Sequence, residues 1–268
     1  MIIASQSAQV FHRLYYFHSN LKKFHEAKMH TGAVKKVAGQ VIWYDTQVLP
    51  NISPQFFDTE WQQNNGDVYG SAPGRGHAIF FRSEGHELVL RPFRRGGLIG
   101  KVNANKYLRL GAERSRSFRE YSLLNWMRSH ALPVPRPVAA RYSPAGLCYS
   151  ADLITERIPQ ASPLADILQT TPLPLKTWSK IGSAIRQMHA LGVDHSDLNC
   201  RNILVDAHMQ VWLIDFDKCR RRETGSWPLQ NLARLKRSLE KESSKQLEPL
   251  FSGVEWPSLL TGYDRGVN

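Results

Sequence analysis

The pattern of apolar and polar positions from Gly39 onward first predicts short strands. The runs QVIWYDTQVL (residues 40–49), HAIFFRS (77–83) and HELVLRPF (86–93) are rich in β-branched and aromatic residues, and turn-forming residues bound them. Residues 140–158 contain two further runs of this kind around a Ser-Pro-Ala-Gly turn. We therefore expect a small antiparallel sheet in this part of the chain.

One helix is predicted beside this sheet, over residues 113–130. Its apolar side chains recur near helical spacing, at Phe118, Tyr121, Leu124 and Met127. The prolines of residues 132–138 stop the helix, because the residue before a proline is disfavoured in helical conformation. The strands and this helix together form a predicted N-terminal lobe.

The second half of the chain has the longer periodicity of helices. We expect helices over residues 163–170, 172–192 and 227–242, and two short apolar strands, NILVD (202–206) and VWLID (211–215), between the last two. One face of the helix over residues 172–192 is apolar and consists of Trp178, Ile181, Ile185 and Met188.

These elements predict an α+β protein with two lobes. The N-lobe spans residues 41–156, with an antiparallel sheet and one helix, and the mainly helical C-lobe spans residues 157–268. Residues 1–40 show no readable pattern and are assigned to an N-terminal extension.

The charge balance narrows the partners of the protein only in part. Lys and Arg number 35 against 23 Asp and Glu, so the net charge is 35 − 23 = +12. Such a surplus favours an anionic partner or substrate, and nucleic acid, lipid headgroups and nucleotide phosphates all fit it. A solvated positive face with no partner fits it equally well.

The cysteines and the N-terminus favour an intracellular location. The three cysteines lack the spacing of a zinc site or of a disulfide framework, which is typical of a reducing compartment. No secretion signal opens the chain, and no apolar run reaches the length of a membrane span. We expect a cytoplasmic protein, with room for peripheral contact at a membrane.

Two short motifs in the second half carry candidate chemistry. HSDLNCRN (residues 195–202) contains Asp197 and Asn202, and LIDFD (213–217) contains Asp215 at the end of an apolar strand. Phosphoryl transfer needs a group that orients the acceptor hydroxyl and ligands for the metal ions that bridge the phosphates. Asp197 suits the first task as a general base, while Asn202 and Asp215 offer oxygen ligands for Mg²⁺.

Each of these residues alone has a simpler interpretation. His195 could be a core imidazole, Asp197 a helix cap, Asn202 a turn residue and Asp215 a turn former at a strand end. Together they form an HxDxxxxN pattern, then a strand, then an apolar-Asp-Phe element 18 residues after Asp197 (215 − 197). Composition alone rarely produces that combination, so it favours a phosphotransferase.

HSDLNCRNILVD and VWLIDFD resemble the catalytic and metal-binding loops of the protein-kinase-like fold. This resemblance implies ATP and Mg²⁺ as cofactors and a catalytic ion pair of Arg91 with Glu120. It also implies that Val89 covers the adenine and that Glu156 begins the hinge behind it. A glycine-containing turn would cover the phosphates, although a plain hairpin fits these residues too; its glycines are Gly70, Gly74 and Gly76.

Three residues depart from the protein-kinase pattern, and two of them, Ser196 and Asp217, favour a small acceptor. Arg91 stands where that fold usually has Lys, and Ser196 stands where regulated kinases commonly have Arg. Asp217 replaces the usual Gly of the metal-binding loop, residues 213–217, which we call the metal loop. This change makes the loop more acidic and offers a third carboxylate. Only 51 residues follow it (268 − 217), without an APE-like element for gripping a peptide.

Several segments resemble the bacterial lipopolysaccharide core kinases, in particular those that act on 3-deoxy-D-manno-octulosonic acid (Kdo). They include LVLRPFRRGGLIG, RSFREYSLLNWM and NLARLKRSL, and the likeness covers roughly residues 60–240. It implies transfer of the ATP γ-phosphate to the 4-hydroxyl of Kdo on a lipid A precursor. The enzyme would then work at the cytoplasmic face of the inner membrane, with no nucleic acid as partner.

The anionic acceptor implied by this resemblance needs cationic contacts. The candidates are arginines of two basic runs, Arg94, Arg95, Arg220, Arg221 and Arg222, unless these runs are merely solvated. Two alternatives stay open. One is another acceptor, such as a heptose, an aminoglycoside or a protein, and the other is a catalytically dead basic relative that binds membrane or nucleic acid.

Overall fold

The computed structural model describes residues 32–72, 78–93, 107–108, 111–223, 225–245, 251 and 253–265. From Ala33 onward the chain belongs to one compact unit. Four of the predicted site residues lie outside the described residues: Gly74, Gly76, Arg94 and Arg95. Most of the predicted N-terminal extension over residues 1–40 lies outside them as well.

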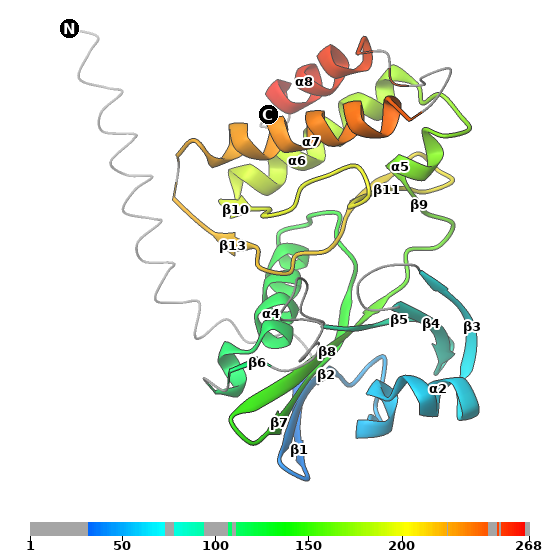
Figure 1. Ribbon diagram of the computed structural model, residues 1–268, viewed down its shortest axis with the longest axis vertical. Coiled ribbons are helices and arrows are strands. Elements are labelled where there is room, and N and C mark those ends of the chain that lie inside the picture. Colours follow the sequence, from blue (N-terminus) through cyan, green and yellow to red (C-terminus); the bar gives the residue numbers. More distant parts are fainter. Residues whose placement is uncertain are drawn as a thin grey trace, which may run out of the picture. The chain divides into compact units, whose positions relative to one another are not determined.

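A large sheet forms the first half of this unit (Figure 1). Its strand order is β1-β2-β7-β8-β5-β4-β3, with β6 also paired to β8, and all pairings from β2 to β3 are antiparallel. The strands are β1 (Gly32–Val37), β2 (Gln40–Asp45), β3 (Asp67–Ala72), β4 (Ala78–Ser83), β5 (His86–Pro92), β6 (Tyr107–Leu108), β7 (Pro137–Ala145) and β8 (Cys148–Glu156). The sheet thus begins at Gly32, within the segment assigned to the extension.

Helix α4 (Arg116–Ser129) packs against β7 and β8 on one face of the sheet. Ser115 caps it by accepting a hydrogen bond from the backbone N–H of Phe118 at 3.3 Å. The apolar face predicted from spacing is the buried one, with Tyr121, Leu124 and Met127 almost fully covered. This packing fixes the orientation of Glu120, which lies on the same helix and is also buried.

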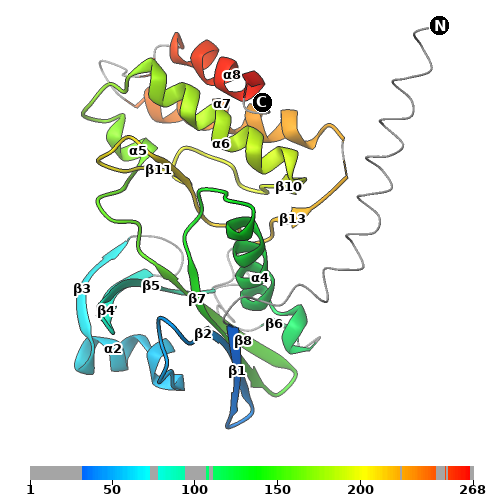
Figure 2. The ribbon, with the colours of Figure 1, turned by 180° about the vertical axis from the view of Figure 1, so that it is seen from behind.

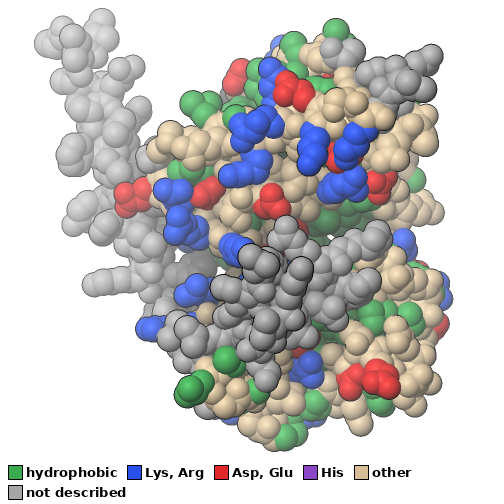
Figure 3. Space-filling view, in the orientation of Figure 1, with side chains coloured by type: hydrophobic (Ala, Val, Ile, Leu, Met, Phe, Trp, Pro, Cys, Tyr) green, Lys and Arg blue, Asp and Glu red, His purple; other side chains and the backbone are tan. Residues whose placement is uncertain are grey.

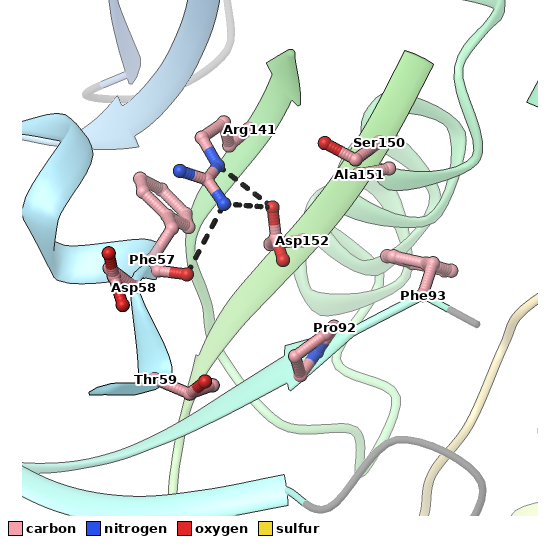
Figure 4. A pocket seen from close by; sticks show the side chains of 9 residues that line it. All are labelled: Phe57, Asp58, Thr59, Pro92, Phe93, Arg141, Ser150, Ala151 and Asp152. Atoms are coloured by element: carbon pink, nitrogen blue, oxygen red, sulfur yellow. Dashed lines mark hydrogen bonds and ion pairs between the residues drawn. The ribbon is translucent and has the colours of Figure 1, made fainter. Parts of the chain in front are cut away.

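The opposite face of the sheet is covered by two short elements that the sequence pattern did not predict, η2 (Pro54–Phe57) and α2 (Thr59–Asn65). Arg141 on β7 and Asp152 on β8 form a buried ion pair there, at 2.8 Å (Figure 4). Arg141 also donates to the carbonyl of Phe57 at 3.2 Å, which fastens η2 to the sheet. The hollow beside this pair has a volume of about 240 Å³.

The second half of the unit is mainly helical, and α6, α7 and α8 lie side by side in both views (Figures 1 and 2). The helices are α5 (Leu164–Ile167), α6 (Leu175–Ala190), α7 (Trp227–Ser243) and α8 (Glu255–Arg265). The predicted apolar face of α6 is buried at all four positions. The helix predicted over residues 163–170 is a single turn, and α8 was not predicted.

Short strands connect these helices and hold the loops that carry the candidate chemistry. They are β9 (Ser162–Pro163), β10 (Val193–Asp194), β11 (Ile203–Val205), β12 (Val211–Leu213) and β13 (Arg220–Arg221). β12, β11 and β9 form one small sheet, and β10 pairs with β13. The two strands predicted around residues 202–215 are therefore present, although each is only three residues long.

One hydrophobic core runs from the α4 face of the sheet into the helical half, from Tyr121 and Leu153 to Trp178 and Leu235. The sheet with its helices and the helical half that follows have the α+β, protein-kinase-like organisation predicted from the sequence. The lobe boundary near Glu156 stays a prediction. No helix in the described part of the chain is long and apolar enough to cross a membrane.

Candidate active site

Asp197 lies in the loop between β10 and β11, with its side chain exposed. Two amides hold its backbone: the side chains of Asn199 and Asn202 each donate to the Asp197 carbonyl at 2.9 Å. The loop is thereby fixed while the carboxylate remains open to solvent. A carboxylate held in this way can accept a proton from a hydroxyl that approaches it.

His195 joins this loop to the metal loop. Its ring is fully buried, and burial lowers its pKa, so the imidazole is neutral at physiological pH. Nε2 faces the carbonyl of Ile214 at 3.0 Å and must carry the hydrogen, while Nδ1 accepts from the backbone N–H of Asp197 at 3.3 Å. The core-imidazole interpretation of His195 is therefore right, and its structural task is to hold both loops in register.

Asp215 follows β12 and turns sharply away from the strand. Its φ of 62° lies in the left-handed region, which Asp tolerates better than most residues. The next residue, Phe216, is buried against the His195 ring, with the ring centroids 4.8 Å apart. Burial of Phe216 therefore fixes the position from which the half-exposed Asp215 carboxylate extends.

Arg91 connects the sheet to both α4 and the metal loop. Its guanidinium contacts Glu120 Oε1 at 2.5 Å through Nη2 and Asp215 Oδ1 at 2.7 Å through Nη1. Glu120 Oε1 also accepts from the backbone N–H of Phe216 at 3.2 Å. The ion pair of Arg91 with Glu120 that the sequence predicts is present, and it includes Asp215 as a third member.

Burial and the neighbouring charges together shift the pKa values of Glu120 and Arg91. Desolvation raises the pKa of Glu120, whose side chain is only 3% exposed, although Arg91 works in the opposite direction. Desolvation also opposes the charge on Arg91, but the two carboxylates outweigh it and raise its pKa. Arg91 is thus a cation held in place by Glu120 and Asp215.

Asn202 and Asp215 offer donors that fit Mg²⁺. Asn202 uses its Nδ2 to bond the Asp197 carbonyl, so its Oδ1 is the atom left to accept or ligate. Asp215 supplies a carboxylate, and Mg²⁺ typically combines one or two such ligands with water and substrate phosphates. These two residues would hold the ion, which would neutralise the charge that develops on the transferred phosphate. Their role as ligands stays a prediction.

Comparison with known sequences now decides the family. The model of the lipopolysaccharide kinase (Kdo/WaaP) family matches residues 59–263. The chain belongs to this family. It is 47% identical over 209 residues to a 3-deoxy-D-manno-octulosonic acid kinase from Vibrio parahaemolyticus, a match that covers 78% of this chain and 88% of the relative.

Two further relatives carry the same name. The Vibrio cholerae protein is 45% identical over 219 residues, which cover 82% of this chain and 91% of its own length. A Haemophilus influenzae protein is 43% identical over 217 residues, covering 78% of this chain and 90% of its own. The family match over residues 59–263 includes strands β3 to β8 of the sheet and the helical half.

The predicted nucleotide contacts of this lipopolysaccharide kinase family member lie along β5, β8 and β3. Val89 is two residues from Arg91 on β5, so the two side chains share a face, and Thr155 faces Val89 from β8. Glu156 ends β8 and contacts His86 at 3.2 Å and Arg136 at 3.4 Å. Gly70 lies within β3 opposite Phe80, next to a β-bulge, rather than in the turn itself. Their contacts with nucleotide stay predictions.

The basic run after the metal loop is only partly available for an acceptor. Arg221 lies over the Trp126 ring at 4.1 Å, and burial lowers its pKa. Arg222 contacts Asp194 at 3.0 Å. Arg220 is exposed and makes no ion pair or ring contact with a described residue, so it is the best placed of the three.

Basic side chains also gather over α7, on the face shown in Figure 3. Lys236, Arg237 and Lys241 are all exposed there. Lys236 is 3.9 Å from Glu240, which offsets part of its charge. Helix α7 thus contributes part of the positive surplus of this kinase.

One buried residue that contacts the loop of His195 and Asp197 was not predicted from the sequence. Asn231 on α7 is 2% exposed, and its Oδ1 accepts from the backbone N–H of His195 at 3.0 Å. Its Nδ2 donates to Asp194 at 3.0 Å. It could have been found, because it falls in the apolar stripe between Trp227 and Leu235, where a polar residue needs a buried partner.

Proposed function

We propose that this chain transfers the γ-phosphate of ATP to the 4-hydroxyl of a Kdo sugar on a lipid A precursor, with Mg²⁺ as cofactor. The observation that carries the proposal is the agreement of its relatives. All three relatives described above are named 3-deoxy-D-manno-octulosonic acid kinase, and the similarity extends over nine-tenths of their lengths. The family match adds lipopolysaccharide as the class of acceptor.

The proposed roles follow from the chemistry of each side chain. Asp197 orients the sugar hydroxyl and accepts its proton as the bond to phosphorus forms. Arg91 contacts the phosphates of ATP and is kept in place by Glu120, while Asn202 and Asp215 bind the metal ion. Phosphoryl transfer asks little covalent chemistry of the protein, so positioning and charge supply most of the catalysis.

The remaining proposed residues serve the two substrates. Val89 and Glu156 would border the adenine, and Gly70, Gly74 and Gly76 the phosphates. Arg94, Arg95, Arg220 and Arg221 would contact the carboxylate and phosphates of the glycolipid. Of the two that the structure describes, Arg220 is exposed and Arg221 is partly buried. Guanidinium groups suit both anions because they donate hydrogen bonds in pairs.

Such an acceptor would bring the protein to the cytoplasmic face of the inner membrane as a peripheral protein. The exposed cations of α7 support this, because a basic surface is attracted to anionic headgroups within about a Debye length. The proposal also assigns the lobes, with residues 41–156 covering the nucleotide and residues 157–268 carrying the catalytic and metal-binding loops.

An acceptor panel tests the proposal. The protein is incubated with γ-labelled ATP, Mg²⁺ and one purified acceptor at a time: a Kdo-bearing lipid A precursor, a heptose-bearing core, an aminoglycoside or a protein. We expect label on the Kdo-bearing lipid and its loss when EDTA removes the metal. Label on another acceptor alone would contradict the proposed substrate, and no label on any of them would favour a catalytically inactive relative.

A further inference from the structure

Arg116, the first residue of α4, forms an ion pair between this helix and the metal loop. Its Nε donates to Asp217 Oδ1 at 2.8 Å, and its Nη2 contacts Asp217 Oδ2, so the pair is bidentate. Both side chains are about four-fifths buried, with 20% and 19% exposed. Bidentate, partly buried guanidinium–carboxylate pairs have well-defined geometry, unlike single contacts at the surface.

Asp217 is also held by the catalytic loop. Ser196 Oγ donates to the backbone carbonyl of Asp217 at 3.2 Å, and the Ser196 N–H faces Cys219 Sγ at 3.4 Å. Ser196 and Asp217 are two of the residues that depart from the protein-kinase pattern, and they contact one another. Asp217 therefore links three elements: α4, the metal loop and the loop that carries Asp197.

The ion pair of Arg116 with Asp217 lies one helical turn from the Arg91 triad. Glu120, four residues after Arg116 on α4, accepts from the N–H of Phe216, and Arg116 binds the residue after Phe216. The guanidinium groups of Arg91 and Arg116 both lie over the Phe93 ring, at 4.8 and 5.4 Å. Helix α4 is thus attached to two successive residues of the metal loop, Phe216 through Glu120 and Asp217 through Arg116. Any shift of α4 would move Glu120 relative to Asp215.

We propose that Arg116 and Asp217 are positioning residues that keep α4 docked on the metal loop, so that Glu120, Arg91 and Asp215 stay aligned for phosphoryl transfer. The Asp217 carboxylate is part of the protein itself, so the docking of α4 would not require phosphorylation of the protein. This inference rests on the proposed phosphotransferase function. It also corrects the expectation that Asp217 adds a third free carboxylate to the site, because Arg116 engages both of its oxygens.

The test compares Arg116→Gln, Asp217→Asn and the double variant with the unmodified protein. We expect kcat for transfer to the Kdo-bearing lipid to fall about 10- to 100-fold in each single variant, the size typical of small misplacements of reacting groups. The KM for the lipid should change little, because the two side chains engage each other and are not among the residues proposed to contact the acceptor. The loss of kcat in the double variant should not exceed that of the less active single variant, because both substitutions break the same interaction.

Arg141→Gln/Asp152→Asn is the matched control. It removes another buried guanidinium–carboxylate pair, which lies on the face of the sheet opposite α4 (Figure 4). We expect it to lower Tm while kcat of the folded protein stays at the unmodified value. A loss of kcat in this control equal to that of Asp217→Asn would assign the effect to stability and overturn the inference.

Hydrogen exchange of α4 provides a readout that does not depend on the acceptor. The first turns of α4 should exchange at least about 10-fold faster in Asp217→Asn than in the unmodified protein, and at an unchanged rate in the control. The inference would be overturned if Asp217→Asn kept the exchange rate or the kcat of the unmodified protein. It would also be overturned if the kcat losses of the two single variants multiplied in the double variant. An unmodified protein that phosphorylates no acceptor would instead contradict the proposed function, and exchange would still decide the positioning role.

Discussion

At the scale of single residues, Glu120 is the centre of the proposed catalytic arrangement. Its Oε1 accepts from Arg91 and from the Phe216 backbone, and the carboxylate is almost completely buried. A buried carboxylate beside one guanidinium is stable only while that partner remains charged and close. Glu120 therefore determines where the Arg91 guanidinium points, although its own side chain would not contact the acceptor.

Glu120→Gln should reduce turnover without unfolding the protein. The amide keeps the shape and one acceptor oxygen, but it leaves Arg91 paired with Asp215 alone, and the guanidinium is then less well directed toward phosphate. We expect kcat/KM for ATP to fall about 10- to 100-fold. Steady-state kinetics measures this, and calorimetric titration with ATP and Mg²⁺ reports the loss of affinity.

Glu87→Gln is the control for this substitution. Glu87 pairs with Arg157 at 3.0 Å on the same strand as Arg91, but its side chain is 36% exposed. Exposed pairs contribute little, so ATP kinetics should be unchanged. Equal effects of the two substitutions would contradict the assigned role of Glu120.

The site residues that could be predicted share one property: their spacing along the chain carries the chemistry. Asp197 and Asn202 belong to one loop, and Asp215 follows the next strand, so a single short segment showed them. Arg116 and Asp217 lie 101 residues apart, and their contact exists only because α4 packs beside the metal loop. No local pattern could predict that pair, nor the stacking of Arg221 on Trp126.

At the scale of elements, the close packing of α6 on α8 depends on two glycines. A Cβ on Gly182 would lie 1.9 Å from the carbonyl oxygen of Leu259, and one on Gly262 would lie 1.9 Å from that of Ser179. Both clashes are with backbone, which cannot move aside as a side chain can. The two helices therefore approach each other more closely than any larger residue would allow.

Gly182→Ala should destabilise the fold by about 1–3 kcal/mol, the usual cost of overpacking, although alanine favours helix in isolation. Urea unfolding measures this. Gly225→Ala is the control, because a Cβ there would meet only the Trp227 side chain at an ordinary 3.6 Å. A stability of Gly182→Ala equal to that of this control would show that the helices can separate freely.

The same packing explains which elements the sequence predicted. Helices α6 and α7 have long apolar stripes, and β5 contains the apolar run Leu-Val-Leu of residues 88–90, so local pattern was sufficient. Helix α8 contains Pro257 and Gly262, and α2 is the polar run TEWQQNN. Helix α8 is stabilised by its packing on the distant helix α6, which propensity does not contain, while α2 packs on its sequence neighbours η2 and β3.

At the scale of the whole molecule, a buried polar network ties the C-terminal helices to the catalytic loop. His189 on α6 contacts Tyr263 of α8 at 2.8 Å and Asn231 of α7 at 3.4 Å, and Asn231 binds the backbone of His195. Burial lowers the pKa of His189 to about 4 despite the nearby Asp194. The network thus requires a neutral imidazole.

Stability should therefore fall as the pH decreases from about 6.5 toward 4. In that window the unfolded chain binds a proton at residue 189 and the folded chain does not, so acid favours unfolding. The fall in the pKa of His189 from 6.5 to about 4 corresponds to about 3 kcal/mol. Arg186 and His195 also face this group and oppose its protonation.

Urea unfolding between pH 7.5 and 4.5 measures this dependence, with His189→Gln as the comparison. The glutamine side chain keeps hydrogen-bonding capacity but does not titrate, so the variant should show a smaller loss of stability in acid. His195 is also buried and neutral, so part of the slope should remain. Identical slopes in the two proteins would contradict the pKa assigned to His189.

The central claim is that Asp197 directs phosphoryl transfer from ATP to Kdo. Its most direct test is the mass and label of a purified Kdo-bearing lipid A precursor after reaction with the unmodified protein and with Asp197→Asn. The account predicts one added phosphate on Kdo with the unmodified protein, and a rate about 10²- to 10⁴-fold lower with the variant, which should still bind ATP. No phosphate on Kdo with the unmodified protein, or equal rates for the two proteins, would contradict it.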